Sequence, residues 1–514
     1  MSRFLLICLI VMLITSCSVN PVTGQRDFTL LSVAEEVSIG EKNFAPARQA
    51  QGGDYYVDME LQRYVSDVGL KLAAVADNRQ LPYEFRVLNN PVPNAWALPG
   101  GKIARNRGLL PFLRDEAQLA AVLAHEIVHT AARHSAIQIT RGSMMQLGTS
   151  LLGARAEGSI YESYADLAVS LGSTAWMARY RRSDELEADL YGMRYMARAG
   201  YEPVAAVELQ QTFLALAGKA ETEESWFNAL FSSHPPSPKR VSANQMTARG
   251  LVSGARYKNR FEHAMRNLRK DKRAYNAAQA AGRALSKKLP KNAIKLLDKA
   301  IAIQPSEAEF WRLKGNAWEQ LNMVDNAERD YSSAIAKDAN YYLNFLERGI
   351  FRYKQGEIAA GVSDIRLSHK LLPTAFSNYY LGQNALLSED YQIAETYLRA
   401  AVNSTSTVRD KARASLESLL LEHKPEQFLK TALSRSDSGI LQVYITNMGP
   451  VKLMVTNLQI SITDNNFGQD RVIELKTTLV PKQTVRVETD IISGLSKWTS
   501  GQYRARVVSA AVMD

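Results

Sequence analysis

The chain contains 514 residues, which at about 100–200 residues per domain predicts roughly three domains rather than one. Hydrophobic residues make up 46% and charged residues 22%, which argues against a mostly disordered chain and a multi-pass membrane protein. The net charge of +10 favours anionic lipid or nucleic acid as a partner, but no nucleic-acid motif accompanies it, so a solvated basic surface is the simpler interpretation.

The N-terminus has the pattern of a secretion signal. Arg3 precedes an apolar run over residues 4–14, too short to span a bilayer but typical of a signal peptide. Ile14 ends this run, and the sequence Ile14-Thr15-Ser16-Cys17 resembles the lipobox of bacterial lipoproteins. This resemblance implies removal of residues 1–16, acylation of Cys17 and, because Ser18 follows, an outer-membrane lipoprotein facing the periplasm. The alternative is an ordinary signal peptide on a soluble periplasmic protein.

Residues 17–45 carry turn residues without strong periodicity, so we expect an extended tether. Over residues 46–265 the apolar pattern is helical and amphipathic, interrupted by β-rich pieces at 83–88 and 95–98. Proline and glycine flank these pieces. This region is therefore predicted to combine helices with a hairpin or small sheet.

An internal repeat occupies residues 270–425. Small residues recur there at intervals of 33 or 34 residues, as in Gly282, Gly315, Gly349 and Gly382. This period resembles the tetratricopeptide repeat, in which paired helices approach closely at small side chains. Four units predict an α-solenoid with a concave groove for peptides or partner proteins, or a packing scaffold without a ligand.

From residue 428 to residue 514 the periodicity changes to two. The alternating segments are 440–446, 458–462, 472–475, 484–488 and 503–507. Short strands separated by turn residues predict a small β-sandwich. No chemical motif lies on it, so its expected role is adhesion or spacing.

The strongest chemical motif is His125-Glu126-Ile-Val-His129, within a strongly helical segment. Histidines four residues apart share one face of a helix, so both imidazoles can reach one tetrahedral Zn²⁺. Glu126 can then act as general base for a water at the open position of the metal. Both cysteines, Cys8 and Cys17, lie near the N-terminus, so the other ligands must be histidine or carboxylate.

A third protein ligand is expected for a hydrolytic zinc site. Glu185 and Asp189 are one helical turn apart, so Glu185 can bind the metal while Asp189 accepts a hydrogen bond from a ligand histidine. The alternative is a solvated acidic helix face. Glu187 is the residue most easily mistaken for the ligand. His134 follows His129 by five residues, off the ligand face, and is expected to be structural.

These two motifs, with Asn-Ala-Trp-Ala-Leu-Pro-Gly-Gly at residues 94–101, resemble the gluzincin family of the CAAX prenyl protease and the HtpX membrane protease. Periplasmic members of that family add tetratricopeptide repeats. The resemblance covers residues from about 20 to 405 and excludes the β-rich tail. It implies one zinc ion per chain, bound by His125, His129 and Glu185, with Glu126 as base and Asp189 behind the ligands.

The resemblance also implies an edge strand that holds unfolded substrates by backbone pairing. Its residues are Asn94, Ala95, Trp96, Ala97 and Leu98.

Two further residues have open roles. His234 matches a histidine of that family. It has three possible roles: a switch that occupies the water position of the metal, a transition-state donor, or a cap before Pro235. Arg240 either polarises a substrate carbonyl or lies on a surface helix. The glycine-rich residues 140–175 form either a lid over the site or ordinary helix packing.

The sequence thus predicts a multidomain, mainly α protein with an α+β zincin-like catalytic domain, an α-solenoid of repeats and a C-terminal β-sandwich. The predicted function is peptide-bond hydrolysis by a periplasmic zinc endopeptidase anchored to the outer membrane, and the resemblance implies misfolded or unassembled envelope proteins as its substrates. Outer-membrane assembly machinery is a possible partner through the repeats, and nucleic acid is not expected. The alternative is a chaperone or assembly adaptor that acts through the repeats and carries a latent zinc site.

Overall fold

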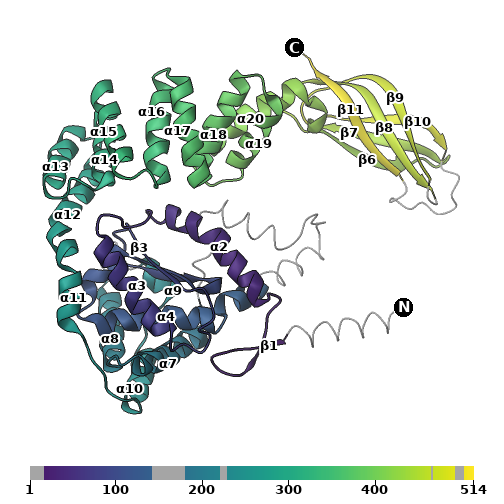
Figure 1. Cartoon of the computed structure of the whole chain (residues 1–514). Coiled ribbons are helices and arrows are strands. Elements are labelled where there is room, and N and C mark those ends of the chain that lie inside the picture. The colour runs from purple at the N-terminus through teal and green to yellow at the C-terminus, as the bar shows by residue number, and fades with distance from the viewer. Residues whose placement is uncertain (1–16, 142–179, 220–227, 465–466, 493–502, 514) are drawn as a thin grey trace, which may run out of the picture. The chain divides into compact units, whose positions relative to one another are not determined.

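The computed structural model describes residues 17–141, 180–219, 228–464, 467–492 and 503–513 (Figure 1). By packing, the chain divides into two compact units, the first ending at Ser377 and the second beginning at Asn378. Within the described ranges, no helix is long and apolar enough to cross a membrane. The predicted signal peptide, and the predicted lid from residue 142 onward, lie outside the described residues.

The N-terminal part of the first unit packs helices around a small sheet (Figure 1). Its strands and short helices are β1 Cys17–Val19, β2 Arg26–Phe28, β3 Glu84–Leu88, β4 Ala95–Leu98, η1 Pro99–Gly101, β5 Lys102–Asn106 and η2 Arg107–Phe112. Its helices are α2 Val33–Ala50, α3 Met59–Ala73, α4 Glu116–Ala131, α7 Arg182–Arg198, α8 Val204–Lys219, α9 Asn228–Ser233, α10 Pro238–Arg249 and α11 Lys258–Ala264. The prediction of helices beside a sheet is confirmed.

Of the two predicted arrangements, a hairpin or a small sheet, the structure has the small sheet, in which the two predicted strands do not pair with each other. The sheet order is β3-β5-β4, with β3 parallel and β4 antiparallel to the central β5. Strand β5 was not predicted, because the polar residues in its sequence Lys-Ile-Ala-Arg-Asn suggest an exposed segment. All five are nevertheless buried, and Lys102 forms an ion pair with Glu84 of β3.

The prediction of an extended tether over residues 17–45 was wrong beyond residue 32, because helix α2 begins at Val33. The Ser32 hydroxyl accepts a hydrogen bond from the Glu35 backbone N–H, and the Glu35 carboxylate accepts one from the Ser32 backbone N–H. This reciprocal cap starts the helix. Gly40 then lets α2 lie against η1, since an added Cβ there would be 2.1 Å from the Pro99 carbonyl oxygen.

Helix α4 lies at the centre of this part of the unit. Every residue from Glu116 to Ala131 is buried except His125. Asp115 caps its N-terminus by accepting a hydrogen bond from the Gln118 backbone. Helices α3, α7 and α8 pack against α4, so the HExxH motif sits inside the core rather than on a surface.

The repeat prediction is confirmed by consecutive helices that pack in pairs, α12 with α13, α14 with α15, and α16 with α17. Small residues at the repeated positions, such as Ala293, Ala327 and Ala334, are fully buried between them. The helices of the region are α12 Arg266–Ser286, α13 Pro290–Ile303, α14 Ala308–Gln320, α15 Val324–Lys337, α16 Tyr342–Lys354, α17 Ile358–Leu371, α18 Ala375–Leu387, α19 Tyr391–Val402 and α20 Arg409–His423. The division between the two units falls within α18.

The second unit ends in the predicted β-sandwich. Its elements are η4 Pro425–Phe428, β6 Leu429–Arg435, β7 Ile440–Asn447, β8 Leu453–Asp464, β9 Phe467–Leu479, β10 Thr484–Ile492 and β11 Tyr503–Val512. The sheets β10-β7-β6 and β11-β8-β9 are antiparallel and share one apolar core, to which Val443 and Leu458 contribute. Strand β6 was not among the predicted strands.

A buried polar cluster joins the first repeat helices to the sheet region of the same unit. Glu307, before α14, accepts hydrogen bonds from the Asn89 amide at 3.0 Å and the Tyr275 hydroxyl at 2.8 Å. The Arg107 guanidinium lies 3.5 Å from the centre of the Tyr275 ring. Burial raises the pKa of Glu307 to about 7, and the nearby Glu309 adds to this shift.

This raised pKa predicts how stability depends on pH. A carboxyl whose pKa is higher in the folded than in the unfolded chain stabilises the fold below pH 4.5, and that contribution is lost as pH rises through about 7. Glu307→Gln should therefore match the wild type in thermal unfolding near pH 5 and exceed it near pH 8.5, by about 3 kcal/mol at most. A difference that is constant across this pH range would contradict the prediction.

Candidate metal centre

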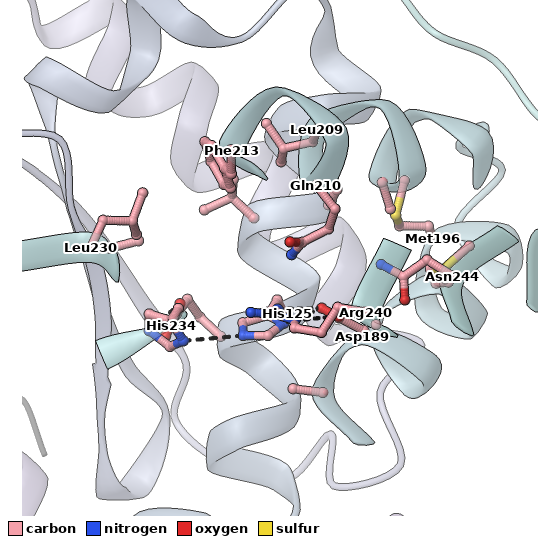
Figure 2. Close-up of a pocket in the computed structure, with 18 of the residues that line it drawn as sticks. His125, Asp189, Met196, Leu209, Gln210, Phe213, Leu230, His234, Arg240 and Asn244 are labelled. Carbon is pink, nitrogen blue, oxygen red and sulfur yellow. Dashed lines mark hydrogen bonds and ion pairs between the residues drawn. The ribbon is translucent and has the colours of Figure 1, made fainter. Parts of the chain in front are cut away.

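Four side chains from three parts of the chain converge beside α4. The Nε2 atoms of His125 and His129 are 3.1 Å apart. The Nδ1 atom of His234, which follows α9, is 3.3 Å from His125 Nε2 and 2.9 Å from Glu185 Oε1 on α7. Figure 2 shows His125 and His234 pointing toward each other. All four candidate ligand atoms lie within 4.8 Å of one another.

Close packing of α7 on α4 brings Glu185 to the histidines. Gly192 of α7 faces the α4 backbone. A Cβ added to it would lie 3.2 Å from the backbone nitrogen of His125. Glu185, Ala188 and Asp189 share the buried face of α7. The sequence prediction that Glu185 and Asp189 share a helix face agrees with this arrangement.

Asp189 holds one of the motif histidines. Its Oδ1 is 2.9 Å from His125 Nδ1, and Arg240 of α10 donates to both Asp189 oxygens at 2.7 Å. Arg240 also lies 2.7 Å from Glu185 Oε2. Because Arg240 is only 4% exposed, the surface-helix alternative was wrong. Its guanidinium forms ion pairs with these two carboxylates of α7 and donates a hydrogen bond to the Pro235 carbonyl at 3.3 Å.

His134 and Glu187 hold the other motif histidine, a function that the sequence analysis missed. His129 Nδ1 is 2.9 Å from His134 Nδ1, and His134 Nε2 is 3.2 Å from Glu187 Oε1. His134 is off the ligand face, as expected, but the sequence argument assumed a continuous helix. Helix α4 ends at Ala131, and Arg133 adopts a positive φ of 62°, which turns the chain back toward His129.

The donor set fits a divalent metal ion. When His125 donates its Nδ1 proton to Asp189 and His129 donates its own to His134, both Nε2 atoms present lone pairs toward each other. Two lone pairs 3.1 Å apart repel unless a metal ion or a proton lies between them. Without a metal ion, Glu185 and Asp189 raise the pKa of His125 to about 10, so a proton on its Nε2 can bridge the pair. Two imidazoles with a carboxylate are ligands that zinc accepts, and His234 Nδ1 is placed to act as a fourth.

The pKa values of the two carboxylates Glu185 and Glu126 are shifted in opposite directions. Burial opposes ionisation of Glu185, but His234 and His125 lower its pKa well below the usual value. Burial raises the pKa of Glu126, which suits a group that must take up a proton, and His234 partly opposes this. Burial lowers the pKa of His129 well below its usual value, so its imidazole is neutral.

The predicted substrate strand lies beside this centre. Residues Ala95–Leu98 form β4, at one edge of the three-stranded sheet. Asn94, Trp96 and the other side chains of this segment are buried. Ala95 lines the same cavity as Glu126 and His234.

Cys17, the predicted lipidation site, lies in β1 opposite Phe28.

Residues 60–248 match the family model described as Peptidase family M48. This segment is a peptidase M48 domain. It contains the HExxH helix and the residues Glu185, Asp189, His234 and Arg240.

Relatives of known name cover the same region. The mitochondrial metalloendopeptidase OMA1 of Schizosaccharomyces pombe is 32% identical over 222 residues, which is 43% of this chain and 63% of that protein. The beta-barrel assembly-enhancing protease of Escherichia coli is 29% identical over 230 residues, or 43% of this chain and 44% of that protein. The chain thus matches less than two thirds of the length of these relatives.

The contact between His129 and His134 predicts a loss of metal affinity when His134 is replaced. His134→Phe removes the acceptor for the His129 Nδ1 proton, so zinc affinity should fall about 10–100-fold. Glu187→Ala should weaken binding in the same direction, and His263→Phe, at an exposed histidine, should not change it. Competition with a chelator measures these affinities. Unchanged affinity in folded His134→Phe protein would contradict the assignment.

Proposed function

We propose that the M48 domain is a zinc-dependent endopeptidase. The observation that carries this proposal is the convergence of His125, His129 and Glu185, with the buried Glu126 beside them. A divalent metal ion held by these residues would supply the Lewis acid that activates water and polarises the scissile carbonyl. The similarity to named metalloendopeptidases supports the same reaction.

Glu126 is the general base in this proposal. Its Oε2 atom is buried without a hydrogen-bond partner among the described residues, and its Oε1 is 3.5 Å from His234 Nε2. The carboxylate takes the proton of the attacking water and passes it to the leaving amine. Asp189 and His134 keep the ligand imidazoles in the required tautomers meanwhile.

His234 makes the described arrangement latent. Its Nδ1 atom lies within the ligand cluster, at the point where a fourth donor would exclude the attacking water. Activity then requires His234 to move away. The alternative role as a transition-state donor is less well supported, because Nδ1 faces the ligand atoms and contacts Glu185.

The proposed substrates are misfolded or unassembled envelope proteins. Support comes from the relatives named beta-barrel assembly-enhancing protease and from the repeats, an architecture that commonly binds proteins. Backbone pairing to the edge strand β4 would accept unfolded chains of varied sequence. Acylation of Cys17 would place the domain at the periplasmic face of the outer membrane.

Replacement of the base tests the proposal. Glu126→Gln should still bind zinc, because the ligands are intact, but it should cleave unfolded casein at least about 100-fold more slowly. Glu60→Gln, at an exposed carboxylate, is the control and should cleave normally. If Glu126→Gln and wild-type protein act equally well in cells, the adaptor function is the correct one.

The latent arrangement predicts the effect of removing His234. His234→Ala should raise the cleavage rate several-fold while zinc content stays the same, because the position for the attacking water becomes accessible. His263→Ala is the matched control. A loss of activity in His234→Ala would instead identify His234 as a transition-state donor.

A further inference from the structure

Arg133 lies in the turn that follows α4 and directly precedes His134. Its backbone N–H donates to the Thr130 carbonyl at 3.1 Å, and its own carbonyl accepts from the Ile137 N–H at 3.0 Å. Its φ of 62° lies in the left-handed region, which is unfavourable for a residue with a side chain. Such a conformation persists only where the surrounding structure holds it. The contacts of Arg133 therefore decide whether His134 can approach His129.

The side chain of Arg133 contacts the N-terminal segment of the chain. Its Nε donates to Glu36 Oε1 at 2.5 Å, and its Nη2 donates to the Leu31 carbonyl at 2.5 Å. Arg133 is 6% exposed and Glu36 is 2% exposed, so this ion pair lies in the interior of the protein. Loss of one partner would leave the charge of the other buried without compensation. Glu36 belongs to α2, so this helix holds the turn at Arg133.

A second contact connects the same segment to the residues after His134. Residues 134–141 are helical, and Thr140 Oγ1 accepts a hydrogen bond from the Leu30 N–H at 3.0 Å. The hydroxyls of Thr29 and Thr140 are 3.4 Å apart, and both side chains are buried. Residues 29–36, here called the N-terminal strap, thus contact both the turn at Arg133 and the helical segment that begins with His134.

We propose that Arg133 is a positioning residue of the metal centre and that the N-terminal strap acts through it. This inference rests on the proposed metal-dependent function. The strap holds the left-handed turn, the turn directs His134 toward His129, and His134 accepts the Nδ1 proton of His129. The Nε2 atom of His129 is then available to a metal ion. The strap lies outside residues 60–248, which match the M48 family model, so the N-terminal segment completes the centre from outside that region.

A double-mutant cycle on zinc affinity tests this role. Chelator competition is measured on the full chain at pH 8, above the pKa of about 7 that burial gives Glu36 against the opposing effect of Arg133. Arg133→Gln should lower the zinc affinity about three- to tenfold, because it displaces His134. Added to His134→Phe, it should lower the affinity no further. Unchanged affinity, or an equal loss in both backgrounds, would overturn the inference.

A second variant and a matched control separate positioning from folding. Thr140→Val keeps the shape of the side chain and removes the hydroxyl that accepts from Leu30, so it should weaken zinc binding in the same direction. Arg312→Gln is the control, because Arg312 is also buried and its Nη1 lies 2.9 Å from Glu347 Oε1 in the repeats. Its zinc affinity should equal that of the wild type. Equal losses in Arg133→Gln and Arg312→Gln would show a general effect on folding and overturn the inference.

The ring ¹⁵N signals of the histidines separate this inference from the proposed function, because they need no metal. In zinc-free protein labelled at histidine, Arg133→Gln should shift the NMR signals of His129 and His134, whereas Arg312→Gln should not. The His134 signals are identified by their absence in His134→Phe. Unshifted signals would overturn the inference even if the enzyme is active. Shifted signals in a protein that binds no zinc would contradict only the metal-dependent function.

Discussion

The metal centre depends on the hydrogen bonds that fix the Nδ1 atoms of the two motif histidines. Asp189 holds His125 directly, and Glu187 holds His129 through His134. Both carboxylates belong to α7, so the packing of α7 on α4 directs both Nε2 atoms toward the same point. The proposed ligand Glu185 comes from the same helix. Displacement of α7 would therefore disturb all three ligands together.

Burial extends this constraint to the rest of the site. Because α4 lies in the core, the carboxylates around it must be paired, and Arg240 of α10 compensates both Asp189 and Glu185. The same close packing leaves a cavity beside Glu126. A buried, rigid ligand set and an adjoining cavity are what a hydrolytic site needs to hold a metal and exclude bulk water.

Local periodicity determined what the sequence could predict. The HExxH spacing, the pair Glu185 and Asp189, and the period of the repeats all follow from regular helices, and the structure shows those helices. His134 could not be assigned, because its approach to His129 depends on the left-handed backbone at Arg133. Strand β5 was missed for a different reason: its polar residues are satisfied only by tertiary contacts, such as that between Lys102 and Glu84.

Zinc K-edge X-ray absorption on the purified full chain tests the central claim most directly. We expect one zinc ion per chain in a four-coordinate shell of nitrogen and oxygen without sulfur. Part of the histidine scattering should disappear in His234→Ala, and zinc should be lost when His125 is replaced by alanine. A shell containing sulfur, or bound zinc whose spectrum is the same in both variants, would show that the metal lies elsewhere and would contradict the account.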